Sequence, residues 1–157
     1  MPYANELVLM IHPALGVLGI LATLWILVET INVGDGNVGR IRILSLASAI
    51  LVWLTYFVGG YWYVTQYAAD QAIILAGPWP IAHSVAMETK EHVFLMLLLL
   101  ATLLPIVAYS SRLTRNGVQR LMIWICALIV VTGLSMEGAG AFISMGAKVA
   151  LLAKTAA

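Results

Sequence analysis

The chain has three histidines, and two of them, His12 and His92, fall in or at the start of long apolar stretches. Neutral imidazole is a common metal ligand, and ionisable side chains inside a membrane are costly and usually functional. His12 lies 17 residues before Glu29, and His92 lies 20 residues before Arg112. Because a helix rises about 1.5 Å per residue, these similar counts predict that both imidazoles lie at one depth.

Glycines and a carboxylate occur at the same depth on the two other apolar stretches. They are Gly59, Gly60, Glu137, Gly138 and Gly140. Glycine leaves room for a flat ring between helices, although it is also common where helices pack closely. Two interpretations of Glu137 are open: a charge at the membrane boundary, or a carboxylate that points inward as a proton acceptor or metal ligand.

Four apolar stretches are the elements that must position these residues. They cover residues 7–28, 43–64, 92–110 and 121–138. Each approaches or exceeds the roughly 20 residues that cross a hydrocarbon core. Because 62% of the 157 residues are hydrophobic and only 10% are charged, a water-soluble core is excluded. We therefore predict an all-α integral membrane protein, folded as a single up-down-up-down four-helix transmembrane bundle with no second domain.

The connections between these stretches differ in character. Residues 66–82 are expected to form an extracytoplasmic loop, because Gly77-Pro-Trp-Pro80 is incompatible with a continuing helix. This passage is expected to cover the histidine layer. The third helix is expected to begin near Ile81, ahead of its apolar run. The tail 139–157 either extends the fourth helix or lies along the membrane interface.

Basic residues predict the orientation. Five arginines flank the connections after the first and third stretches, whereas the opposite side holds three lysines. Because basic residues are retained on the cytoplasmic side, we predict a protein of the inner membrane with both termini outside. The net charge of +1 without a basic run excludes a nucleic-acid partner. The single cysteine, Cys126, excludes a disulfide framework and a thiolate metal cluster.

Parallel helices one and three sit diagonally opposite in such a bundle, so His12 and His92 are expected to face each other across the core. Haem held by two axial histidines is a low-spin electron carrier. With the neighbouring glycines, this pair resembles membrane b-type cytochromes of the four-helix kind, whose haems are held by histidine pairs on diagonal helices. The resemblance implies one haem b, with His12 and His92 as axial ligands near the extracytoplasmic face, because a second pair near the cytoplasmic face is missing.

His83 and Glu88 lie close to this predicted centre. Glu88 precedes His92 by four residues, so the two share a helix face, and the carboxylate is expected to orient the imidazole or to bind a metal directly. His83 lies nine residues before His92, about half a revolution away. Three roles remain open for it: a contact to a haem propionate, a gate, or a solvated side chain.

Three functional hypotheses follow. The first is electron transfer by the haem protein, with a quinol, a periplasmic electron carrier or a larger complex as partner. The second is a non-haem iron, copper or zinc site built from His12, His92, Glu88, Glu137 and His83. The third is a cofactor-free structural or assembly subunit. Contacts with the lipid bilayer, with other membrane subunits or within a homo-oligomer fit all three. No nucleophile with a matched base is visible, so a catalytic role is not assigned.

Overall fold

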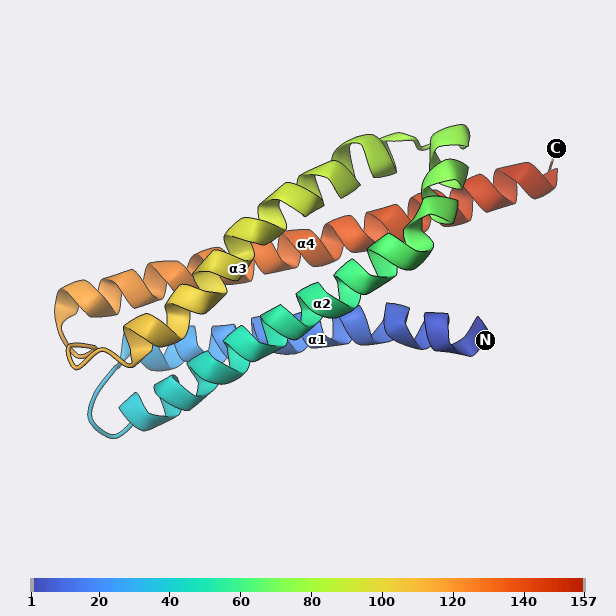
Figure 1. Cartoon of the computed structure of the whole chain (residues 1–157). Helices are drawn as coiled ribbons and strands as arrows, with labels where there is room; N and C mark the ends of the chain where they lie inside the picture. Colours follow the sequence, from blue (N-terminus) through green and yellow to red (C-terminus); the bar gives the residue numbers. More distant parts are fainter. Residues whose placement is uncertain (1, 157) are drawn as a thin grey trace.

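Four long helices run antiparallel to one another in one bundle (Figure 1). The computed structural model describes the backbone of residues 2–156 and the side chains of residues 7–156. In chain order the elements are α1 (Pro2–Ile31), α2 (Val38–Ala76), the short π-helix η1 (Ala82–Met87), α3 (Glu88–Ala108) and α4 (Asn116–Ala156). The predicted all-α, up-down-up-down four-helix bundle is confirmed.

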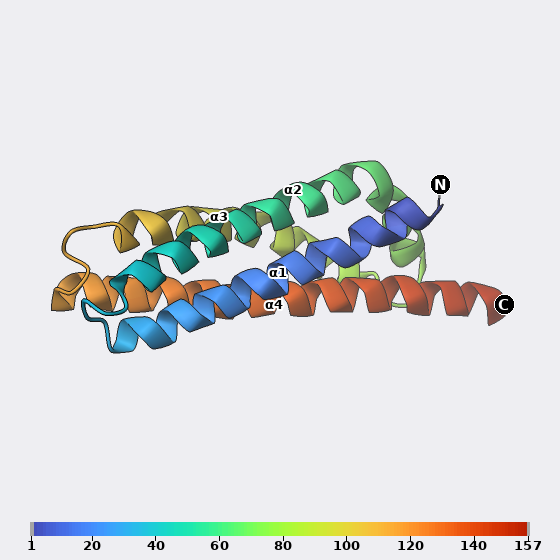
Figure 2. The same cartoon turned by 90° about the horizontal axis from the view of Figure 1, so that it is seen from below.

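The helices pack in a ring, with α1 diagonally opposite α3 (Figures 1 and 2). α1 contacts α2 and α4, and α3 contacts the same two helices, whereas no contact joins α1 and α3 within the described chain. The connections 32–37 and 109–115 are short, and short connections make consecutive helices antiparallel neighbours. α2 and α4 also touch each other, so these two helices separate α1 from α3.

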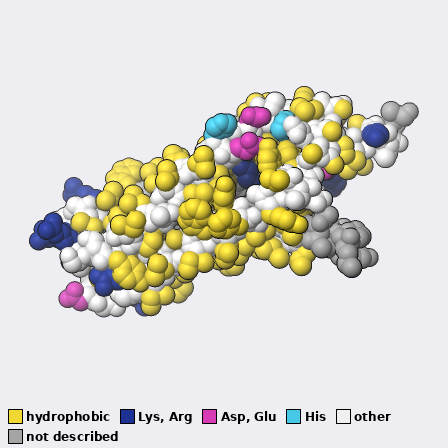
Figure 3. Space-filling model, viewed as in Figure 1, with side chains coloured by type: hydrophobic (Ala, Val, Ile, Leu, Met, Phe, Trp, Pro, Cys, Tyr) yellow, Lys and Arg dark blue, Asp and Glu magenta, His cyan; other side chains and the backbone are white. Residues whose placement is uncertain are grey.

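All four helices are long and apolar enough to span a bilayer. The candidate spans are Leu7–Ile31, Val38–Ala76, Ala82–Ala108 and Asn116–Ala156. Large apolar side chains, such as Leu99, Trp124 and Val131, are exposed on the outside of the bundle. Hydrophobic side chains cover most of the face drawn in Figure 3. Because such a surface is unfavourable in water and favourable against lipid tails, the chain is an integral membrane protein associated with a lipid bilayer.

Small and polar residues allow α1 to pack closely on its neighbours. The hydroxyl of Thr23 lies 2.6 Å from that of Ser48 on α2. A Cβ added to Gly133 of α4 would lie 2.8 Å from Cγ1 of Ile20, so glycine permits this approach. Ile20 and Thr23 follow His12 at helical spacing. The face of α1 that packs on α2 and α4 is therefore the face that carries His12.

α2 and α4 are longer than a bilayer requires, with 39 and 41 residues. At about 1.5 Å per residue they exceed a hydrocarbon core about 30 Å thick. We call the extra helical layer near the two termini the head (Figure 1). It comprises residues 67–76, 77–81, 82–87 and 139–156.

The structure of the head bears on the predicted loop 66–82 and on the predicted tail 139–157. The predicted loop 66–82 is wrong for most of its length, because α2 remains helical to Ala76 and only 77–81 separate it from η1. Residues 66–76 are rich in helix-forming Ala and Gln, and buried Tyr67 and Ile74 lie two turns apart on one face. The tail 139–156 extends α4 rather than lying apart from it, and the helical region before α3 begins at Ala82.

The Gly-Pro-Trp-Pro passage packs on α4. A Cβ at Gly77 would collide with Ala150, and the ring of Trp79 stacks on Phe142 with centroids 5.7 Å apart. These contacts close the end of the head. The passage lines neither of the cavities described below.

Lysine and arginine side chains gather at the opposite end of the bundle, where the two short connections lie (Figure 3). Arg40 forms an ion pair with Glu29, with Nε 2.9 Å from Oε1. Arg42 donates a hydrogen bond from Nε to the carbonyl oxygen of Ala108, 3.1 Å away. These contacts tie α2 to the ends of α1 and α3 at this end of the bundle.

Candidate functional site

A pocket of about 560 Å³, which we call the main pocket, lies between the four helices in the half of the bundle next to the head. α1 contributes Leu9, His12 and Pro13 to it. α2 contributes an aromatic and glycine-rich stretch, and α3 and α4 contribute the remaining wall. Its volume falls in the range of pockets that enclose cofactor-sized ligands, about 300–1,000 Å³. The main pocket is therefore the candidate binding site.

His12 lies in the wall of this pocket in a fixed orientation. Its Nδ1 lies 2.9 Å from the carbonyl oxygen of Thr55 on α2. A carbonyl oxygen only accepts, so Nδ1 carries the proton and Nε2 keeps its lone pair. Histidines that ligate metals are usually held by such a hydrogen bond from the second ring nitrogen. In neutral His12, Nε2 is therefore the ring nitrogen whose lone pair can accept a hydrogen bond or bind a metal.

Gly59 allows the ring of His12 to take this position. A Cβ added to Gly59 would collide with the imidazole. Gly60 and Gly140 also line the main pocket, as expected from the sequence. Gly138 does not line it, and a Cβ there would meet nothing within 4 Å.

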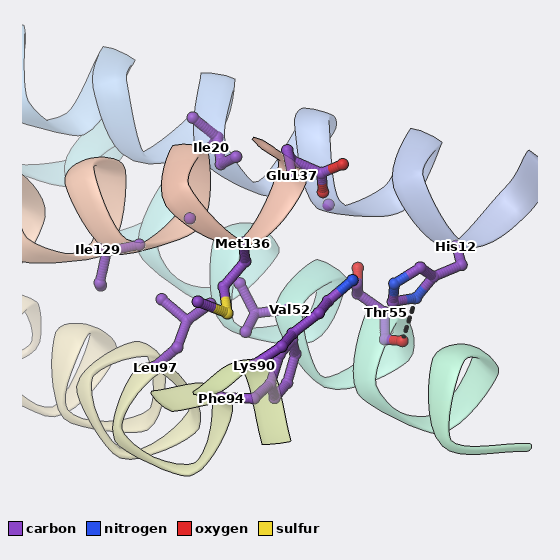
Figure 4. Close-up of a pocket in the computed structure, with 12 residues that line it drawn as sticks. His12, Ile20, Val52, Thr55, Lys90, Phe94, Leu97, Ile129, Met136 and Glu137 are labelled. Carbon is purple, nitrogen blue, oxygen red and sulfur yellow. Dashed lines mark hydrogen bonds between the residues drawn. The ribbon is translucent and has the colours of Figure 1, made fainter. Parts of the chain in front are cut away.

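A smaller cavity of about 20 Å³ lies next to the main pocket (Figure 4). Its polar lining comes from His12, Thr55, Lys90 and Glu137, and apolar side chains complete the wall. A cavity needs about 10–15 Å³ to hold one water molecule. This space therefore fits a single water molecule among four polar residues.

Glu137 and Lys90 line both cavities. A Cβ added to Gly16 of α1 would collide with Oε1 of Glu137. The carboxylate therefore points into the bundle, which is the inward direction that one of the two interpretations of Glu137 expected. The Nζ of Lys90 lies 3.1 Å from the position of a Cβ on Gly140. Neither charge forms a hydrogen bond or an ion pair within 4 Å in the described part of the chain. From the sequence, Lys90 counted only among the basic residues that predict the orientation, and its place in the pocket was not predicted.

His92 is exposed and lines neither cavity. Its Nδ1 donates to the backbone carbonyl of Glu88, 2.7 Å away, within the same helix. Lys90 and Phe94 are the α3 residues that line both cavities. His92 lies two residues beyond Lys90, about 200° around the helix. The structure therefore does not bring His92 to His12, although the two helices are diagonal as predicted.

His83 is buried in the head, with 7% of its surface exposed. The side-chain amide nitrogen of Gln71 lies 2.9 Å from Nε2, and the hydroxyl of Tyr67 lies 2.9 Å from Nδ1. An amide nitrogen only donates, so Nε2 accepts and Nδ1 donates to Tyr67. His83 is thus not a solvated side chain, and it does not line either cavity.

Glu88 turns toward His83 and not toward His92. Its carboxylate lies 3.9 Å from Nε2 of His83. Only its backbone carbonyl contacts His92, so the predicted carboxylate support of that imidazole is not formed. The π-helix that contains His83 places one extra residue in its turn, which changes the faces of the residues on either side.

Among the described residues, no group of three or more His, Cys, Asp or Glu side chains is arranged to hold a metal ion. The five residues of the non-haem hypothesis are divided between the main pocket, the head and the outer face of α3. His12 and Glu137 are the two of them that share a cavity.

No protein-family model, curated protein or solved structure matches this chain. The functional proposal below is therefore based on the geometry of the main pocket.

Proposed function

We propose that the chain is a membrane b-type haem protein that transfers single electrons, with one haem in the main pocket and His12 as an axial ligand. The supporting observation is the hydrogen bond from Nδ1 of His12 to the carbonyl of Thr55. It leaves Nε2 of an imidazole in the wall of a pocket of about 560 Å³. Bound haem supplies reversible one-electron chemistry, and the protein tunes it through the axial ligand and the surroundings.

The residues present fit such a group in three respects. The pocket has a cofactor's volume, one imidazole is oriented as a ligand, and glycines occur where a ring would pass between helices. Aromatic side chains of Tyr56, Trp62 and Phe94 offer apolar contacts to a flat ring. The proposal differs from the pair expected from the sequence, because His92 lies on the outer face of α3.

The residues of the chain have distinct tasks in this proposal. His12 binds iron, and the Thr55 carbonyl fixes the ring orientation and makes the imidazole a better donor. The apolar walls exclude water from the site. The pocket also includes exposed side chains of α1, α2 and α3, namely Leu9, Val64 and Leu95. It therefore reaches the bundle surface, where a membrane-dissolved partner such as a quinol could approach.

Orientation and partners belong to the same proposal. The five arginines flanking the short connections support a cytoplasmic position for that end, with the head and both termini outside. The haem then lies in the outer half of an inner membrane. A quinol, a periplasmic electron carrier, another membrane subunit or a second copy of the chain are partners that suit this location.

An absorption spectrum of the protein purified in mild detergent tests the proposal. We expect a Soret band and sharp visible bands after reduction, both lost in His12→Ala. His92→Ala is the matched control and should keep them, because His92 lines neither cavity. A colourless protein with stoichiometric bound metal would favour the non-haem hypothesis. A folded protein without haem or metal would favour the cofactor-free subunit.

A further inference from the structure

We infer that the end of the bundle opposite the head binds an anionic phospholipid, whose phosphate is held by Arg112, Arg115 and Arg120. We call these three residues the arginine surface. An acyl chain of the same lipid lies along the exposed face of α4. The arginine surface lies at the other end of the bundle from the main pocket, so lipid binding there does not depend on the proposed function.

The arginine surface is not used by the fold. Arg112 and Arg115 lie in the connection between α3 and α4, and Arg120 lies in the second turn of α4. All three are exposed, and their side chains form no hydrogen bond and no ion pair within the described chain. Their guanidinium groups are therefore available to a partner.

The other charged groups at this end leave the arginine surface strongly positive (Figure 3). Arg40 and Glu29 pair with each other, and Nε of Arg42 donates to a backbone carbonyl. Asp35 is the one further acidic residue near the short connections. Three available arginines against one carboxylate attract an anion. A planar guanidinium matches a phosphate group in particular, because it donates two parallel hydrogen bonds to it.

Arg120 also begins a stripe of α4 that faces lipid. Trp124, Leu128 and Val131 follow it at helical spacing, and all three side chains are exposed. Tryptophan is typical of the boundary between headgroups and hydrocarbon. From Arg120 to Val131 the helix rises about 16 Å, roughly half of a hydrocarbon core about 30 Å thick. The stripe therefore has the length and the polarity of one lipid leaflet.

A second copy of the chain fits this face less well than a lipid does. A twofold dimer pairs a surface with itself, so packing through the stripe would bring Arg120 toward the same residue of the other copy. Like charges placed together are unfavourable. A phospholipid carries a negative charge at the level of the arginines and an apolar chain at the level of the stripe, and basic clusters beside membrane helices favour anionic lipids.

Native mass spectrometry of the protein released from detergent tests the inference by counting bound lipid. The probes are phosphatidylglycerol, which is anionic, and phosphatidylcholine with the same acyl chains and no net charge. We expect the wild type to retain phosphatidylglycerol in preference to phosphatidylcholine. The combined variant Arg112→Gln, Arg115→Gln and Arg120→Gln should bind phosphatidylglycerol at least tenfold more weakly.

The matched control removes exposed positive charge from the opposite end of the molecule. Lys148→Gln with Lys154→Gln should bind phosphatidylglycerol as the wild type does. Because the three arginines make no side-chain contacts within the described chain, the combined arginine variant should melt at the wild-type temperature in detergent without added lipid. The comparison is then between folded proteins.

Four results would overturn the inference. The arginine variant could bind phosphatidylglycerol as tightly as the wild type, or the wild type could retain both lipids equally. Soluble glycerol phosphate could displace the lipid at equal concentration, which would make the site one for free phosphate. A wild-type dimer in detergent that Trp124→Ala converts to a monomer would assign the stripe to a second copy of the chain.

Discussion

The ring of His12 on α1 lies so close to Gly59 on α2 that a single methyl group at Gly59 would collide with it. The same ring is held from the side by the carbonyl of Thr55, one helical turn earlier on α2. The two contacts fix both the direction and the depth of the imidazole. α2 therefore determines where Nε2 of His12 points.

Gly59→Ala should displace this imidazole. Overpacking of this kind lowers the free energy of unfolding by about 1–3 kcal/mol, and the haem content should fall with it. Thermal unfolding in detergent and the haem-to-protein ratio measure the two effects. Gly39→Ala on the same helix is the control, because a Cβ there meets nothing within 4 Å and Gly39 lines neither cavity.

A double variant sharpens this test. In His12→Ala the ring is absent, so adding Gly59→Ala should no longer lower the free energy of unfolding. Equal losses of stability with and without the imidazole would mean that Gly59 is needed for some contact other than His12.

The sequence predicted the fold because span length and apolar composition are properties of each segment alone. Counting residues from charged anchors placed His12, Gly59 and Glu137 correctly at one depth, since helical rise is constant. It did not reveal which way each side chain turns. His92 has the expected depth but the wrong angle, because the rotation of α3 is set by packing on α2 and α4.

The head escaped prediction for a related reason. The Gly77-Pro-Trp-Pro80 passage suggested a loop over residues 66–82, yet Tyr67 and Ile74 are buried by contacts with η1 and α4, far along the chain. Such long-range burial leaves only a weak local signal. Lys90 was overlooked similarly: a lysine at the edge of an apolar run looks like a boundary charge until the opposite helices are in place.

Gly146→Ala should loosen the head from α4. A Cβ at Gly146 would lie 2.5 Å from the Cβ of Ala82, the first residue of η1. We expect the free energy of unfolding to fall by about 1–3 kcal/mol because neither backbone can move aside easily. Gly138→Ala, which meets nothing within 4 Å on the same helix, should be neutral or slightly stabilising. Similar melting temperatures for the two variants would contradict the close packing of η1 on α4.

Tyr67→Phe should destabilise the head without changing its shape. It removes the acceptor for Nδ1 of His83 in a site where Tyr67 is 1% exposed. A buried donor left without a partner lowers stability by about 1–3 kcal/mol. Tyr61→Phe removes the same hydroxyl from a side chain that is 60% exposed and should change stability little. If both variants melt alike, the hydrogen bond between Tyr67 and His83 contributes nothing measurable.

The orientation of the bundle can be tested with single cysteines, because the native Cys126 is fully buried and should give little background labelling. Ser111→Cys lies in the exposed connection between α3 and α4, and Thr155→Cys lies on the exposed end of α4. The arginines near the short connections predict that a membrane-impermeant maleimide labels Thr155→Cys on intact cells and Ser111→Cys only after lysis. The opposite pattern would place the main pocket in the cytoplasmic half of the membrane and replace a periplasmic electron partner with a cytoplasmic one. The position of His12 would be unaffected, since it comes from the packing of α1 on α2 and α4.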